Sequence, residues 1–229
     1  MGYPSIPPHL IWELIALVGG LTGFIIYCLQ KTSSRLALKG LGLIILWLGF
    51  TGLLATKGFF LAFDSLPPRF IVAMLPPTIF LVWCIKSDRI TQYFTPLSPV
   101  YFVGIQSFRV MMELILMALS SILLLPLILT YHGWNYDILI GLSAPLISYR
   151  LFARQSVYRV ARVWNKLGIL QLLVIIGTAL LSIPSPFQQL AFDTPTIFAA
   201  YFPFIWVPAF IVPCALFFHI VSLKQLSNK

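Results

Sequence analysis

The chain has 229 residues, of which 59% are hydrophobic and only 9% are charged, and its formal net charge is +9. A soluble globular domain is about 25% charged, so this composition excludes a soluble enzyme, a disordered segment and a disulfide-rich secreted scaffold. The mean hydropathy of +0.95 predicts an all-α, multi-pass membrane protein that forms one integral membrane domain over residues 1–229.

Seven apolar segments approach the length of about 20 residues that a helix needs to cross a bilayer. In chain order they lie at 10–29, 40–55, 70–85, 101–128, 138–151, 167–183 and 197–218. Proline pairs precede the first and the third segment, which is typical of the first turn of a helix. The fifth segment is the weakest, because only twelve uncharged residues separate Asp137 from Arg150.

The positive-inside rule supports the fifth segment and orients the bundle. With seven spans, the basic residues outside the spans divide twelve against two between the two sides of the membrane. Without the fifth span, the division becomes five against nine. The sequence therefore predicts seven transmembrane helices in the plasma (inner) membrane, with the N-terminus outside and the C-terminus in the cytoplasm.

Polar residues follow one stripe of the fourth segment. The stripe consists of Gln106, Arg109, Glu113 and Ser120. Steps of three, four and seven residues put all of them on one helix face. A charge at the bilayer centre costs about 2.5–3.5 kcal/mol on insertion scales, so we expect this face to meet the bundle interior or a water-filled cavity. Arg109 and Glu113 can form an ion pair that either locks the helices together or belongs to a substrate or proton site.

His219, near the predicted cytoplasmic end of the seventh segment, is a further candidate for that site. We expect its depth to be similar to that of Arg109, which falls in the predicted cytoplasmic half of the fourth segment. A histidine close to a glutamate can relay protons, because imidazole titrates near physiological pH. The alternative is that His219 only caps the end of its helix at the interface.

Prolines interrupt two of the predicted spans. They are Pro76 and Pro77 in the third segment, and Pro203, Pro208 and Pro213 in the seventh. A proline inside a helix removes one backbone hydrogen bond and bends the helix. The bends either improve helix packing or act as hinges beside a polar cavity.

Asn135 and Asp137 directly precede the fifth segment, on the predicted outer side. Either side chain can cap the helix that follows, or the two can line the outer mouth of a site. His132 and Asp137 alone are too few to hold a metal ion. We therefore expect neither a metal nor a cofactor.

The cytoplasmic segment 150–166 is basic. Its five cationic side chains are those of Arg150, Arg154, Arg159, Arg162 and Lys166. Arg150, Arg154, Arg162 and Lys166 fall on a four-residue repeat, which predicts an amphipathic helix that continues from the fifth span or lies on the membrane and contacts anionic lipid headgroups. The alternative is that these charges only fix the orientation of the protein. Since they lie between apolar spans, they do not indicate nucleic-acid binding.

The sequence contains no HExxH, GxSxG or phosphate-loop motif, so we expect no catalytic residues. The polar stripe and the prolines predict a small-molecule or proton-coupled transporter, with its substrate or proton site at Gln106, Arg109, Glu113 and His219. One alternative is a seven-helix sensor or receptor. Another is a non-catalytic subunit whose Arg109–Glu113 pair docks a membrane protein partner. An enzyme acting on lipids is a fourth alternative, which neither a nucleophile motif nor a set of metal ligands supports.

Overall fold

The structure is a computed structural model that describes residues 5–63, 65, 69–153 and 157–227. This part of the chain is helical and contains no strand, which confirms that the fold is all-α. Five helical segments in it are long and apolar enough to cross a membrane. They are α1 (Pro8–Gln30), α2 (Ser34–Thr56), the continuous rod of α5 and α6 (Pro99–Ser121), α8 (Tyr158–Leu181), and Val207–Ser227, which ends in α9 (Val212–Ser227).

The other described elements are shorter. α3 (Ile71–Lys86) has 16 residues and α7 (Asp137–Ala153) has 17, so both fall below the length of the five long segments. The rod consists of α5 (Pro99–Gly104), the 3-10 turn η2 (Ile105–Ser107) and α6 (Phe108–Ser121). The remaining short elements are α4 (Asp88–Gln92), the 3-10 turns η1 (Phe59–Leu61), η3 (Leu127–Leu129) and η5 (Phe198–Ala200), and the π-helical turn η6 (Val207–Ile211).

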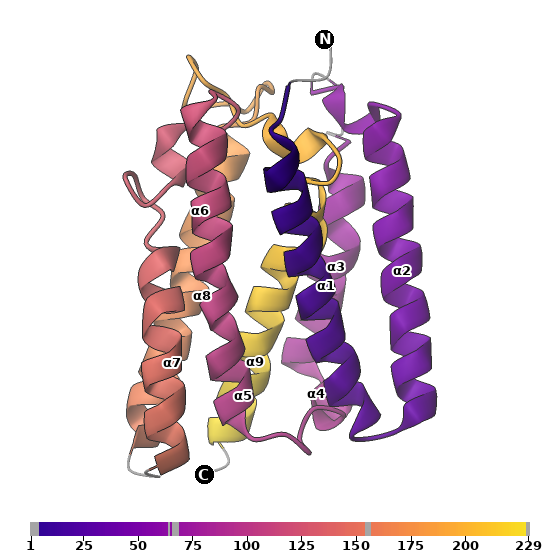
Figure 1. The fold of residues 1–229 in the computed structure, drawn as a ribbon, viewed down its shortest axis with the longest axis vertical. Helices are drawn as coiled ribbons and strands as arrows, with labels where there is room; N and C mark the ends of the chain where they lie inside the picture. Colours follow the sequence, from indigo (N-terminus) through magenta and orange to yellow (C-terminus); the bar gives the residue numbers. More distant parts are fainter. Residues whose placement is uncertain (1–4, 64, 66–68, 154–156, 228–229) are drawn as a thin grey trace.

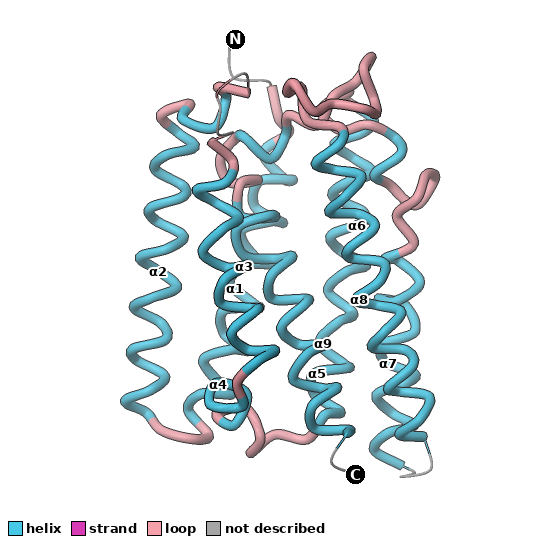
Figure 2. Tube along the Cα trace, turned by 180° about the vertical axis from the view of Figure 1, so that it is seen from behind, coloured by secondary structure: helices cyan, strands magenta, loops and turns pink. Residues whose placement is uncertain are grey.

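The main helices run between two ends of the molecule; α1 begins at one end and α9 ends at the other (Figure 1). α1 leads down from the N-terminal end, α2 leads back, and α3, the α5–α6 rod, α7, α8 and α9 continue the alternation. α7 differs from its neighbours because it begins about halfway along the bundle, below a loop that descends beside α6 (Figures 1 and 2). The first residue of α7 therefore lies inside the molecule.

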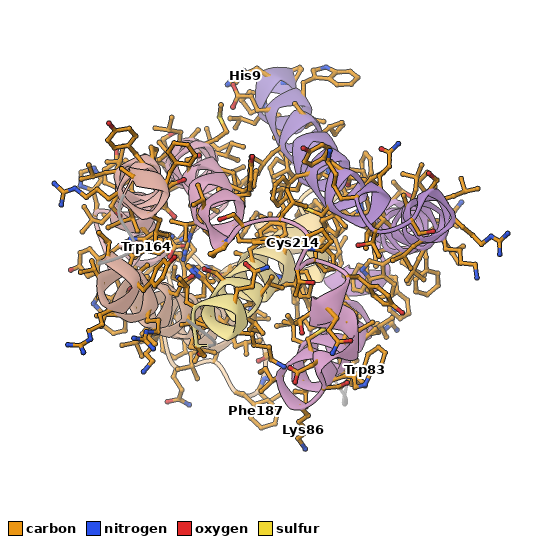
Figure 3. All side chains as sticks on the ribbon, turned by 90° about the horizontal axis from the view of Figure 1, so that it is seen from below. His9, Trp83, Lys86, Trp164, Phe187 and Cys214 are labelled. Carbon is orange, nitrogen blue, oxygen red and sulfur yellow. The ribbon has the colours of Figure 1, made fainter. Side chains whose placement is uncertain are left out.

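α9 is the helix with the most extensive packing. It contacts α8, α5 and α3. Seen from below, α9, which carries the labelled Cys214, lies between these neighbours (Figure 3). α2 packs mainly on α1 at the edge of the bundle and carries many exposed apolar side chains. A side chain on α9 is thus shielded from the surroundings, whereas one on the outer face of α2 is not.

Several predicted spans have different ends in the structure. α2 begins at Ser34 rather than at 40, and α8 begins at Tyr158 rather than at 167. The fourth helix ends at Ser121 rather than at 128, and the chain then turns through η3, which follows Pro126. The last helical segment begins at Val207 rather than at 197. Backbone angles outside the helical range mark these last two differences: Leu123 has a left-handed φ of 60° directly after the fourth helix, and Tyr201 is extended, with φ −97° and ψ 149°, before the last one.

Residues 150–166 do not form the single amphipathic helix that we expected. α7 ends at Ala153 and α8 begins at Tyr158, so the basic residues are divided between two helix ends. Arg150, Arg159 and Lys166 are exposed and Arg162 is half-buried. Arg154 lies outside the described residues.

Candidate functional site

Arg109 is the most deeply buried cation among the described residues. It is the second residue of α6 and is only 2% exposed. Its Nε donates to Asp137 Oδ2 at 2.9 Å, and its Nη2 pairs with Asp137 Oδ1. The partner of Arg109 is therefore Asp137, not Glu113 as the helix spacing suggested. Because α7 starts inside the bundle, Asp137 presents both carboxylate oxygens to the planar guanidinium of Arg109. Glu113, one turn away on the same helix as Arg109, does not make this two-point contact.

His219 lies on the other side of Arg109. Arg109 Nη1 is 2.9 Å from His219 Nε2, and His219 Nδ1 is 2.8 Å from Asn165 Oδ1. Because a guanidinium can only donate, Nε2 is the acceptor and Nδ1 carries the proton. His219 is fully buried in the middle of α9, so it does not cap a helix end.

Asn165 extends the network towards the C-terminal end. Its Nδ2 donates to the Ala161 carbonyl at 2.7 Å and to Ser222 Oγ at 3.1 Å. The indole of Trp164, labelled in Figure 3, lies with its ring centre 5.5 Å from that of His219. α6, α7, α8 and α9 are thus joined by one chain of buried polar contacts.

Glu113 belongs to a second polar group above Arg109. Asn135 Nδ2 donates to Glu113 Oε1 and to the Leu129 carbonyl, and Asn135 Oδ1 accepts from the Asp137 backbone N–H at 3.1 Å. The Tyr131 backbone also interacts with the Glu113 carboxyl group. Glu113 Oε2, however, has no hydrogen-bond partner among the described residues, although Glu113 is only 1% exposed.

Gln106 lies in the 3-10 turn η2, one turn before Arg109. Its Nε2 donates to the Ala215 carbonyl of α9 at 3.0 Å. Gln106 and Ser120 are buried together with the two charged residues of the stripe. The prediction that this face of the fourth span points into the bundle is thereby confirmed, while Gln106 itself anchors α9 rather than contacting Arg109.

A cavity of about 300 Å³ adjoins this polar group. It lies between α3, α6, α8 and the segment from η6 to α9, and most of its wall is apolar. Its polar lining residues are Thr78, Glu113, Asn135, Asp137 and Thr196. Pro208 and Pro213 also line it, so the proline-rich segment predicted from the sequence does border the site.

The structure brings together five of the residues that the sequence singled out. They are Arg109, Glu113, Asn135, Asp137 and His219. Asn135 and Asp137 lie inside the bundle, 1% and 8% exposed, rather than at an outer mouth, because the loop before α7 descends into it. Sequence reasoning missed Asn165, whose position directly before Lys166 in a basic segment suggested a cytoplasmic surface.

The comparisons with known proteins give one match. Neither the curated proteins nor the solved structures contain a chain that matches this one. Residues 67–227 match a family described as "Domain of unknown function (DUF8737)". The matched region includes every residue of the polar network and begins after α2. Since it covers well over half of the sequence, the chain belongs to this family of domains.

Proposed function

We propose that this protein is a proton-coupled transporter of a small molecule, with its substrate site in the cavity beside Glu113. One observation carries the proposal. The cavity of about 300 Å³ reaches a buried carboxyl group, and one oxygen of that group has no hydrogen-bond partner among the described residues. A structural ion pair would be enclosed by packed side chains and would need no such space.

The charge balance of the cluster supports a proton-carrying role for Glu113. Arg109 is matched by Asp137, so the Glu113 carboxylate is one negative charge in excess. A proton on Glu113 makes the cluster neutral, and its release restores the negative charge. Buried ionisable groups in membrane spans are functional candidates by default. In this proposal, gain and loss of the Glu113 proton couple proton movement to substrate movement.

The segments around the cavity contain features that allow movement. α3 contains Pro76 and Pro77, and the opposite wall includes the π-helical turn η6 with Pro208. Such turns are frequent at functional sites, and hinges absorb changes in backbone angle at a few residues. We infer that α3 and η6 move relative to α6 and α8 when the site changes the side to which it opens.

The proposal includes seven spans, with the N-terminus outside and the C-terminus in the cytoplasm of the plasma (inner) membrane. The alternating directions of α1, α2, α3, α5–α6, α7, α8 and α9 support it. α3, at about 1.5 Å per residue, is about 24 Å long, and Lys86 at its end can extend to the interface. The exposed Arg150, Arg159 and Lys166 lie towards the C-terminal end and contact anionic headgroups in this proposal.

Proton movement in proteoliposomes tests the function. Purified protein is reconstituted with a trapped pH indicator, and a panel of small apolar amines, alcohols and carboxylic acids is added under an imposed pH gradient. At least one compound should move protons through the wild type and not through Glu113→Gln. Glu13→Gln is the matched control, because Glu13 lies on α1 away from the cavity. No protein-dependent proton movement with any compound would contradict transport, and binding without movement would favour the sensor alternative.

A further inference from the structure

We propose that the cavity binds a lipophilic amine, that is, a protonated amine on a compact apolar body, with the ammonium group at Glu113 Oε2. The inference rests on the proposed function for the location of the site and adds the chemical class of the substrate.

The polar end of the cavity favours a cation. Glu113 Oε2 has no hydrogen-bond partner among the described residues, and Glu113 is 1% exposed. No described lining residue is a lysine, an arginine or a histidine. Arg109 is the nearest cation of the cluster, and its guanidinium is engaged by Asp137 and His219. A buried carboxylate without a cation is costly, and an ammonium group supplies both the charge and the missing hydrogen-bond donor.

The remaining wall favours an apolar body. Leu116 on α6, Leu172 and Ile176 on α8, and Val212 and Leu216 on the last segment all line the cavity. A volume of about 300 Å³ is at the small end of ligand sites in proteins. A compact hydrocarbon group fits this space.

The same chemistry disfavours two related classes of ligand. A carboxylate of the same shape would place its negative charge beside that of Glu113. Asp137, a further carboxylate, also lines the cavity. An alcohol of the same shape can donate one hydrogen bond to Oε2 but leaves the charge unbalanced. The amine alone satisfies both requirements.

Three probes of matched shape test this assignment. Adamantylamine, adamantanol and adamantane carboxylate are compared by equilibrium binding to the protein in nanodiscs of zwitterionic lipid, with empty nanodiscs as background. The amine should bind at least about tenfold more tightly than the other two, since a charge-assisted hydrogen bond contributes about 1.5–3 kcal/mol. Glu113→Gln should remove this preference, and Glu13→Gln should keep it.

A second pair of variants tests the location without changing a charge. Ala179 lines the cavity on α8, so Ala179→Leu should fill it and weaken the binding of the amine at least about tenfold. Gly177→Leu is the matched control on the same helix, because a Cβ added at position 177 would have no atom within 4 Å. This variant should bind the amine as the wild type does.

The results separate the inference from the proposed function. Equal or tighter binding of the alcohol or the carboxylate, or no binding of any probe, would overturn the assignment of an amine. Proton movement driven by an alcohol or a carboxylate alone would overturn it too, while leaving transport in place. Tight, Glu113-dependent binding of the amine without proton movement would support the inference and contradict the transporter.

Discussion

At the scale of single residues, the partner of Arg109 is the feature that defines the site. The helical spacing of Arg109 and Glu113 correctly predicted that both face the interior. It did not predict that Asp137, 28 residues further along, takes the ion pair. Spacing within one helix fixes the direction of a side chain, whereas a partner on another helix depends on how the loop between the helices folds.

The ion pair predicts unequal effects of two conservative substitutions. Asp137→Asn should lower the stability far more than Glu113→Gln, because it removes the carboxylate that is hydrogen-bonded to the buried guanidinium of Arg109. Breaking a buried pair costs about 3–5 kcal/mol. Thermal unfolding in detergent measures both variants, and the double variant Arg109→Met with Asp137→Leu should recover much of the loss. A larger loss for Glu113→Gln would mean that Glu113 is the true partner.

The contacts of His219 predict its tautomer. Because Nε2 faces the donors of Arg109 and Nδ1 faces Asn165 Oδ1, the ring should be neutral with its proton on Nδ1. NMR of the imidazole nitrogens in the labelled protein reports this directly. Replacement of Asn165 by alanine should shift the ring towards the other tautomer or loosen it. A proton on Nε2 in the wild type would contradict the arrangement around Arg109.

At the scale of helices, glycines set how closely the four helices of the network approach. A Cβ on Gly141 of α7 would lie 2.9 Å from the Val110 backbone nitrogen of α6, and a Cβ on Gly168 of α8 would overlap the His219 ring. Real Cβ atoms do not come so close, so both interfaces need a residue without a side chain. These two contacts hold α7 and α9 at the distances that Arg109 spans.

Substitution of these glycines should therefore disturb the network from outside it. Gly141→Ala and Gly168→Ala should each cost about 1–3 kcal/mol, which is typical of overpacking. Gly168→Ala should in addition displace the His219 ring, which the NMR signals of the ring report. Gly177→Ala, at a position with open space, is the control and should leave the stability unchanged or raise it slightly. Equal effects at all of these positions would contradict the close packing.

The ends of the helices were harder to predict than their existence. Hydropathy located α1, α2 and the α5–α6 rod to within a few residues at most ends, but it extended the fourth span to 128 and began the seventh at 197. In both places the sequence remains apolar while the backbone leaves the helix. Hydropathy reports whether a segment favours an apolar environment, and it does not register the non-helical backbone angles of Leu123 and Tyr201.

At the scale of the whole molecule, the alternation of the helices predicts which loops share a side. Ser33, after α1, and Ser227, at the end of α9, should both face the cytoplasm, whereas Gln189, after α8, should face outwards. All three are exposed. Single cysteines at these positions, in a background in which Cys28, Cys84 and Cys214 are replaced, can be labelled with a reagent that does not cross the membrane.

The expected pattern is labelling of Ser227→Cys and Ser33→Cys from the cytoplasmic side, and of Gln189→Cys from the other side. Cys28, Cys84 and Cys214 are buried in the wild type, so their replacement by alanine removes little exposed surface. Labelling of Ser33→Cys and Ser227→Cys from opposite sides would exclude an arrangement in which seven spans separate the termini.

Composition alone predicted the class of the molecule, and the polar stripe predicted the residues around which the site is built. The cavity and the role of Asn165 were not predictable in the same way. A cavity is a space between helices that are distant in sequence, and α3 and α8, which enclose this one, are separated by about 70 residues. Asn165 has no neighbour in the sequence that reveals its contact with His219.

The pairing of Arg109 with Asp137 also bears on how the chain enters the membrane during synthesis. α6 emerges first, with an arginine that costs about 2.5–3.5 kcal/mol at the bilayer centre. Its counterion is the first residue of the next helix, α7. We therefore expect α6 to remain beside the insertion machinery until α7 arrives, and the two helices to pass into the lipid together as a hairpin.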